Sequence, residues 1–319
     1  MTDTSERSPR GGLGRLLVAA VAFVLFAPAG LVALPLAALL LVSGPRTNRE
    51  LVASGAAVGY ALFWLLSPGE LPDQMVRAAA LIATVVFTVA ALHRRAPFIH
   101  HAMLASVAAA LSVYLLALVL GVSWDQSRWW VEHRMGMVAR GAIALSALAT
   151  ESGVLGLGPG AGEVEIWLNR VVAFMARFHP GVAALQLIAG LALASALTRR
   201  LAVSPRGPAL GRLREFRFTE HLGWAAVIPL IVVLLPKLAA AKAAASNLLL
   251  VAGTLYAVRG LAVTAFGLQL IGAGGVATWL VGTIIAFFLL PVAIAGMILL
   301  GVLDAGLDLR RRLRPRSND

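Results

Sequence analysis

The sequence contains no cysteine, and few of its residues are charged. Without cysteine the chain forms no disulfide, holds no metal through thiolates and uses no cysteine nucleophile. Charged residues make up 13% of the chain, against about 25% in an ordinary soluble domain, whereas apolar residues make up 60%. A soluble fold of 319 residues could not keep that much apolar surface away from water, so the composition predicts an integral membrane protein.

Motifs for catalysis and for nucleotide or metal binding are missing as well. The glycine-rich run 153–162 lacks the Gly-Lys-Ser/Thr ending of a phosphate-binding loop and indicates a flexible linker. The six histidines show no His-Glu-x-x-His spacing, and His100 and His101 are adjacent, so on a helix they point in different directions. No Gly-x-Ser-x-Gly elbow occurs either. We therefore predict no catalytic residue, no metal site and no cofactor, and a protein that is not an enzyme.

The chain instead contains eight apolar segments. Their approximate limits are 16–43, 51–67, 75–92, 102–122, 181–198, 222–239, 247–270 and 276–303. A helix that crosses a bilayer needs about 20 residues, so six of the segments each fit one crossing. The first and the last are longer and contain prolines, which predicts either one long bent helix or a hairpin at each end. The sequence thus predicts an all-α polytopic transmembrane bundle, a single membrane domain (1–319) with eight to ten crossings or re-entrant helices.

The basic residues give this bundle an orientation. The net charge of +12 comes from arginines in short tracts between apolar segments, which is typical of cytoplasmic loops and not of a nucleic-acid-binding surface. The tracts Arg46–Arg49, His93–Arg95 and 199–221 are separated by pairs of crossings, so all three are expected on the cytoplasmic side. With hairpins at both ends, the tail 1–15 and the basic tail 304–319 are cytoplasmic too.

The loop 123–180 then lies on the outer side. Residues 127–149 and 163–178 each show helical spacing of apolar side chains. We expect two amphipathic helices there, which lie on the outer membrane surface or cap the bundle.

Charged residues inside or beside apolar segments are the candidate functional residues, because burying them in lipid costs free energy. Arg259 lies in the middle of a segment and is a candidate for substrate binding, although pairing with a carboxylate or a helix-end carbonyl would give it a structural role. Asp304 and Asp308 are four residues apart, just before Arg310. They could coordinate a cation or carry protons, but we favour structural charge pairs: Asp304, Asp308 and Arg310 are assigned to these pairs, with Arg311, Arg312 or the loop 199–221 as further partners.

The stretch 213–221 alternates charged and aromatic residues just before a membrane segment. It is either an interfacial elbow that contacts lipid phosphates or a docking site for a cytoplasmic partner. The residues assigned to this contact are Arg214, Glu215, Arg217, Glu220 and His221.

The C-terminal third resembles a known family. The stretch 214–221, the run Asn247–Leu250, Tyr256 with Gly260–Val263, and the ending Gly301–Asp304 with Asp308–Arg310 are similar to the YybS-like family of predicted bacterial multi-pass membrane proteins, a domain of unknown function. The resemblance is best over 213–312. It implies location in the bacterial cytoplasmic membrane, and the general layout resembles the substrate-binding subunits of energy-coupling-factor transporters. Arg259 departs from the neutral polar residue expected before Gly260.

Two functions remain open. The first is a membrane subunit of a small-solute transport system, which binds its solute near the outer side and takes energy from a partner or an ion gradient. The alternative is a structural or regulatory cell-envelope protein that recruits cytoplasmic partners through 199–221 and the basic tail. Membrane lipids are expected partners in both, and the sequence carries no indication of the oligomeric state.

Overall fold

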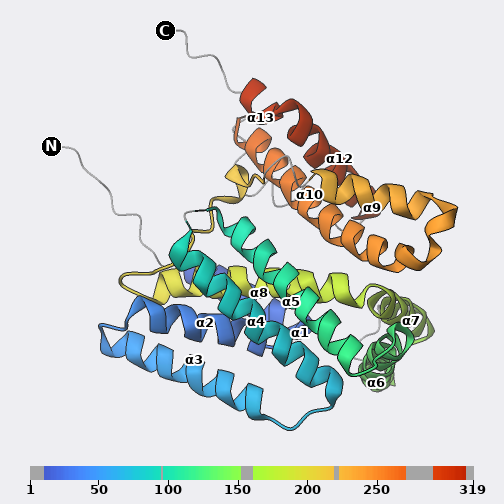
Figure 1. The fold of residues 1–319 in the computed structure, drawn as a ribbon, viewed down its shortest axis with the longest axis horizontal. Coiled ribbons are helices and arrows are strands. Elements are labelled where there is room, and N and C mark those ends of the chain that lie inside the picture. Colours follow the sequence, from blue (N-terminus) through green and yellow to red (C-terminus); the bar gives the residue numbers. More distant parts are fainter. Residues whose placement is uncertain (1–10, 95, 152–160, 219–222, 271–289, 314–319) are drawn as a thin grey trace. The chain divides into compact units, whose positions relative to one another are not determined.

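Apolar helices make up most of the computed structural model, which describes residues 11–94, 96–151, 161–218, 223–270 and 290–313 (Figure 1). The chain divides into two units, Met1–Leu210 (unit 1) and Gly211–Asp319 (unit 2). The division falls inside the basic loop expected at 199–221.

Unit 1 contains eight described helices. They are α1 (Gly11–Phe26), α2 (Gly30–Ser43), α3 (Asn48–Leu66), α4 (Leu71–His93), α5 (Phe98–Val119), α6 (Trp124–Glu151), α7 (Ala161–Arg177) and α8 (His179–Leu201). Four of them, α3, α4, α5 and α8, are long and apolar enough to cross a membrane, in agreement with the predicted segments.

The first apolar segment is not one long helix. It breaks at Ala27–Ala29 into α1 and α2, and the two helices run in opposite directions along α8. The side-chain amide of Gln186 donates to the carbonyl of Phe26 at 2.6 Å, so the end of α1 lies near the start of α8. Leu16, near the start of α1, packs in the same cluster as Leu197, near the end of α8. The hairpin alternative is therefore the one that the structure adopts.

Small residues allow the helices of unit 1 to pack closely. The main core between α4, α5 and α8 contains Phe87 and Leu191, surrounded mostly by alanines. Where α2 meets α8, a Cβ on Gly190 would lie 2.7 Å from the carbonyl oxygen of Leu31. Close approach at small residues is the usual way in which helices associate in lipid, where no hydrophobic effect drives them together.

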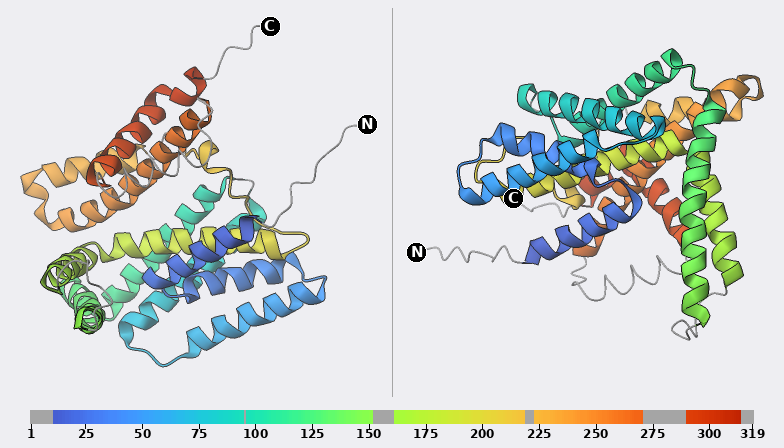
Figure 2. Two further views of the ribbon diagram at one scale, coloured as in Figure 1. Left: turned by 180° about the vertical axis from the view of Figure 1, so that it is seen from behind. Right: turned by 90° about the horizontal axis from the view of Figure 1, so that it is seen from below.

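The helices α6 and α7 form a pair that runs across the direction of α3, α4 and α8 (Figure 2, right). Both helices predicted in the loop 123–180 are thus present. Arg134 of α6 forms an ion pair with Asp73 at the start of α4. The contact joins the start of α4 to the loop 123–180.

At the other end of unit 1, Glu50 near the start of α3 is only 3% exposed and holds two loops together. One carboxylate oxygen accepts hydrogen bonds from the backbone N–H groups of Arg46 (2.7 Å) and Thr47 (2.9 Å), and the other accepts from that of Val203. The backbone N–H of Arg206 donates to the Ser43 hydroxyl at 3.0 Å. We call these contacts the Glu50 clasp. It joins the loop after α2 to the segment after α8, which are two of the three predicted cytoplasmic tracts.

Unit 2 begins with a short elbow and continues with helices. Its described elements are the 3-10 turn η1 (Leu213–Glu215), α9 (Trp224–Leu234), the 3-10 segment η3 (Pro236–Ala241), α10 (Lys242–Leu270), α12 (Leu290–Leu307) and α13 (Leu309–Arg312). Of these, α10 is long and apolar enough to cross a membrane.

The predicted crossing at 222–239 is shorter than expected. Pro229 lies inside α9, and Pro236 follows the last helical turn, so α9 has only 11 residues. At 1.5 Å per residue this is about 16 Å, roughly half of the hydrocarbon thickness of a bilayer. Proline at 236 also explains the ending, because proline pushes the preceding residue, Leu235, to extended backbone (ψ 119°).

The helices α10 and α12 run parallel and cross at two glycines. A Cβ on Gly260 would overlap the carbonyl oxygen of Met297, one turn before Gly301, and a Cβ on Gly301 would overlap that of Tyr256, one turn before Gly260. Both helices therefore end on the same side of unit 2. The first half of the predicted segment 276–303 lies outside the described residues, so the predicted C-terminal hairpin stays a prediction.

The fold class is confirmed at the level of an all-helical protein with several membrane-spanning helices. Among the described residues five helices are long and apolar enough for a crossing, and α2, α9 and the stretch Val292–Leu307 of α12 are shorter apolar helices. The predicted number of eight segments and the similarity to energy-coupling-factor subunits are not established by this architecture.

Candidate functional site

Arg259 in the middle of α10 is 5% exposed and is fully engaged by neighbours in unit 2. Its Nε donates to Asp304 Oδ2 at 2.8 Å, and its Nη2 donates to the Asp304 carbonyl at 3.0 Å. A longer contact of 3.5 Å joins Nη1 to the carbonyl of Phe218, and the guanidinium lies 5.1 Å from the centre of that ring. A cation in an apolar helix is thus satisfied by one carboxylate, two carbonyls and an aromatic face.

Asp304 on α12 is completely buried and binds a second arginine. Arg310 Nη2 lies 2.7 Å from Asp304 Oδ2, and Arg310 Nε donates to Oδ1 at 3.3 Å. The chain must turn sharply after α12 for Arg310 to reach back to Asp304. Asp308 makes this turn with left-handed backbone (φ 46°), a conformation that asparagine and aspartate tolerate better than most residues.

Arg310 also fixes the elbow. Its Nη1 donates to the carbonyl of Arg214 at 2.9 Å and its Nη2 to that of Phe216 at 3.0 Å. Next to these bonds, Phe218 contacts the rings of both Phe216 and Tyr256 edge to face. The elbow is therefore held to α10 and α13 by its main chain and its aromatic rings.

The network of Arg259, Asp304 and Arg310 is not electrically balanced. It contains two guanidinium groups and one carboxylate, all at most 5% exposed. One positive charge is therefore compensated only by carbonyl dipoles among the described residues. Burying a charge without a counter-charge is unfavourable, and the potential around the network favours an anion nearby.

Asp308 supplies a carboxylate close to this network, but it is weakly bound. Its Oδ1 lies 2.9 Å from Arg217 Nη2, with side-chain exposures of 41% and 47%. The same oxygen is covered from solvent, yet no described donor points at it with hydrogen-bond geometry. The four-residue spacing of Asp304 and Asp308 predicts that both lie on one helical face. That prediction is wrong, because α12 ends at Leu307 and the backbone at Asp308 turns away.

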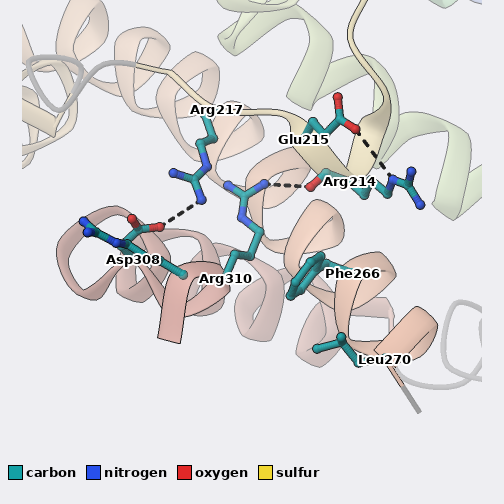
Figure 3. A pocket seen from close by; sticks show the side chains of 8 residues that line it. Arg214, Glu215, Arg217, Phe266, Leu270, Asp308 and Arg310 are labelled. Atoms are coloured by element: carbon teal, nitrogen blue, oxygen red, sulfur yellow. Dashed lines mark hydrogen bonds and ion pairs between the residues drawn. The ribbon is translucent and has the colours of Figure 1, made fainter. Parts of the chain in front are cut away.

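A cavity of about 710 Å³ opens beside the network (Figure 3). Its described wall contains four arginines, two acids and two apolar side chains. They are Arg214, Glu215, Arg217, Phe266, Leu270, Asp308, Arg310 and Arg311. Arg214 and Glu215 form a loose ion pair at 3.8 Å. Of the other charged residues, Arg217 also belongs to the elbow, whereas Asp308, Arg310 and Arg311 lie at or in α13.

The structure brings most of the predicted residues together. Arg259, Asp304 and Arg310 form one network, and Asp308 pairs with Arg217 of the loop 199–221. Asp304 is bound by Arg259 and by Arg310, which was predicted as a member of the structural charge pairs, and no described ion pair joins Asp304 to Arg311 or Arg312. Arg214, Glu215 and Arg217 line the cavity, whereas Glu220 and His221 lie outside the described residues.

Sequence reasoning did not assign Phe266, Leu270 or Arg311 to a site. Phe266 and Leu270 are one turn apart on α10, nearer to the C-terminal end of the helix than Arg259. Their helical spacing from Arg259 could have indicated that they lie on the same side of α10. The sequence indicates Arg311 only as a partner for Asp304 and Asp308. Within the described ranges, His, Asp and Glu side chains form no cluster of three that could hold a metal ion.

Comparison with known proteins places the chain in a family. No curated protein and no solved structure is similar enough to match it. The family model described as "Predicted membrane protein (DUF2232)" matches residues 15–305, which extends far beyond the resemblance noted over 213–312. The prediction of a membrane family of unknown function is thus confirmed, although the YybS-like name remains a resemblance. The chain belongs to the DUF2232 family of predicted membrane proteins.

Proposed function

We propose that this protein is a membrane subunit of a small-solute transport system and that the cavity of unit 2 is its solute-binding site. The carrying observation is the cavity itself, whose volume of about 710 Å³ falls in the range of about 300–1,000 Å³ that small-molecule sites usually have. Its wall combines apolar side chains from α10 with charged groups from the elbow and α13, as a site for a polar organic molecule requires.

The position of the cavity changes one part of the sequence-based hypothesis. A solute site was expected near the outer side, but the cavity lies among the arginines of the elbow and α13. Arginine-rich segments are typical of the cytoplasmic side. In this proposal the solute is therefore released to, or taken from, the cytoplasm at this end of unit 2. Energy comes from a partner or from an ion gradient.

The first test is to identify stoichiometric partners. The tagged protein is purified from its native membrane in mild detergent, and the accompanying proteins are quantified by mass spectrometry. An ATP-hydrolysing or coupling membrane subunit in fixed ratio is the expected result. A matched purification of the Glu215→Lys variant tests whether the cavity rim affects that partner.

A second candidate function has its own support in the elbow. Arg310 holds the main chain of Arg214 and Phe216, while the Glu215 side chain is 60% and the Arg217 side chain 47% exposed. A rigid main chain with exposed charges suits a docking site for a cytoplasmic protein. Stoichiometric recovery of cell-wall, division or signalling proteins, lost in Glu215→Lys, would favour this structural or regulatory role over transport.

A further inference from the structure

The cavity of unit 2 carries an excess of positive charge, as an anion-binding site does. One of its arginines, Arg217, is paired with a carboxylate of the protein itself, that of Asp308. We propose that the cavity binds a phosphate-bearing anion through Arg217, Arg214 and Arg311, and that this phosphate replaces Asp308 as the partner of Arg217. The inference rests on the proposed function only in its choice of cavity, since it concerns the chemistry of the ligand.

The charge around the cavity is the first argument. The wall contributes four arginines and two acids, and Arg310 shares Asp304 with Arg259. Because Arg310 belongs to both, the wall and the buried network together hold five arginines and three acids, an excess of two positive charges. An anion in the cavity interacts favourably with both, and burial strengthens that interaction because solvent screens it less.

The second argument is that the ion pair between Arg217 and Asp308 is weak. Arg217 and Asp308 are roughly half exposed, and solvent screening leaves ion pairs of this kind weak. Asp308 Oδ1 accepts no hydrogen bond from a described donor, although it is covered from solvent. A phosphate offers more acceptor oxygens and more charge than a carboxylate, so Arg217 gains stronger hydrogen bonds by exchanging Asp308 for it.

The type and arrangement of the side chains are the third argument. Arg214 and Arg217 come from the elbow and Arg311 from α13, so three arginines line the cavity from two elements (Figure 3 shows the two elbow arginines). Guanidinium forks match the oxygens of phosphate better than ammonium groups do. Phe266 and Leu270 on α10 give the same cavity an apolar part, which suits the organic portion of a phosphate ester.

A phosphate ester could be a lipid headgroup or a soluble molecule, and two arms of one experiment separate them. The full-length protein is purified in an uncharged detergent. In the first arm it is titrated calorimetrically with sodium phosphate, against sodium chloride at equal ionic strength. In the second arm native mass spectrometry measures the retention of added dioleoyl phosphatidic acid, with dioleoyl phosphatidylcholine as the control. Binding in the first arm identifies a soluble ligand, and binding in the second arm alone identifies a lipid.

Three variants decide the proposal. Arg217→Gln is expected to weaken phosphate or phosphatidic acid binding by about tenfold or more, because a charge-assisted hydrogen bond is lost. Asp308→Asn is expected to tighten it by about two- to tenfold, because the competing charge is removed while asparagine still tolerates the left-handed backbone. Arg212→Gln is the matched control, since Arg212 is an exposed arginine of the same segment that is not among the cavity-lining residues. It is expected to bind like the wild type.

The proposal is overturned if the wild type binds neither probe, if Arg212→Gln loses as much affinity as Arg217→Gln, or if Asp308→Asn binds no tighter. These results are independent of the partner search. Phosphate binding that depends on Arg217, without any transport partner, would retain the site and refute the transport function. A transport partner without phosphate binding would support the transport function and refute the phosphate site.

Discussion

Arg259 and Asp304 are joined twice, through the carboxylate at 2.8 Å and through the backbone carbonyl at 3.0 Å, although they lie on different helices. The second bond uses the Asp304 carbonyl near the C-terminal end of α12, which also accepts the backbone N–H of Asp308 at 3.1 Å. Arg259 is therefore a structural bridge between α10 and α12 in this conformation. It is absent from the described wall of the cavity, which favours the structural alternative over direct substrate binding.

The charge imbalance of this network makes a prediction about two single substitutions. Asp304→Asn leaves two buried guanidinium groups without a carboxylate, and removal of one partner from a buried pair typically costs about 3–5 kcal/mol. Arg259→Gln leaves the balanced pair of Asp304 and Arg310 and is expected to cost clearly less, about 1–3 kcal/mol for the lost hydrogen bonds. Thermal unfolding of the purified variants in detergent should show the lower midpoint for Asp304→Asn.

Glu165→Gln serves as the control for loss of a carboxylate, because Glu165 is exposed on α7 in unit 1. It should unfold at the wild-type midpoint. Equal destabilisation by Asp304→Asn and Arg259→Gln would show that hydrogen bonding, not charge balance, dominates the network.

The glycine crossing of α10 and α12 gives a second prediction. A methyl group on Gly260 would overlap the backbone of Met297, so Gly260→Ala must separate the helices and disturb the nearby Arg259 bridge. We expect a destabilisation of about 1–3 kcal/mol, as for other overpacked sites. The same alanine at Gly267, on the same helix with open space around it, should be neutral or slightly stabilising because alanine favours the helix.

A matching comparison on α12 checks that the effect comes from the crossing. Gly301→Ala should behave like Gly260→Ala, and Gly306→Ala like Gly267→Ala. Unfolding midpoints and the amount of monodisperse protein on size exclusion measure the difference. If the two alanine variants at the crossing are as stable as the two controls, the close approach of the helices is not needed for the fold.

Parts of the fold that depend on segment length could be predicted from the sequence, and parts that depend on helix pairing could not. The helices α3, α4, α5, α8 and α10 follow from apolar segments that are long enough to cross a bilayer. The shortening of α9 is explained by Pro229 and Pro236, whose effects are local. The approach of Glu50 to Val203, however, brings together residues 153 positions apart, and no local pattern contains that information.

The candidate site shows the same limit. Arg259 and Asp304 stand out in the sequence because each charge lies in apolar surroundings, so both were identified as important. Their pairing depends on the parallel register of α10 and α12, which the crossing glycines set. The cavity needs the turn at Asp308 as well, and the helical spacing from Asp304 suggested a continuous helix there. Sequence reasoning thus found the charged residues but not their partners.

The Glu50 clasp makes a third prediction. Glutamine at position 50 keeps the shape of the side chain, but its amide nitrogen cannot accept a hydrogen bond, so at least one of the three backbone N–H groups loses its acceptor. An unsatisfied buried donor costs about 1–3 kcal/mol. We expect Glu50→Gln to loosen the segment after α8 and to increase the rate of tryptic cleavage after Arg206. Wild-type cleavage kinetics in Glu50→Gln, with the Glu165→Gln variant as reference, would argue against the clasp.

The last prediction concerns the orientation of unit 2 in the membrane. Because α9 leads away from the elbow and α10 returns, η3 lies at the end opposite to the elbow, and the parallel α12 brings α13 back to the elbow end. The cysteine-free chain permits single cysteines at Arg212 before the elbow, Lys237 in η3 and Leu313 after α13, all exposed positions.

A membrane-impermeant maleimide added to intact cells should label Lys237→Cys and spare the other two, which react only after the membrane is opened. The physical reason is that arginine-rich segments stay on the cytoplasmic side, and the elbow and α13 together carry most of the arginines of unit 2. Labelling of Leu313→Cys but not Arg212→Cys in intact cells would contradict the contact of Arg310 with the elbow, since one end of unit 2 cannot face both sides. Labelling of both Arg212→Cys and Leu313→Cys, but not of Lys237→Cys, would agree with the fold of unit 2 but reverse its orientation in the membrane. The basic cavity would then lie on the outer side.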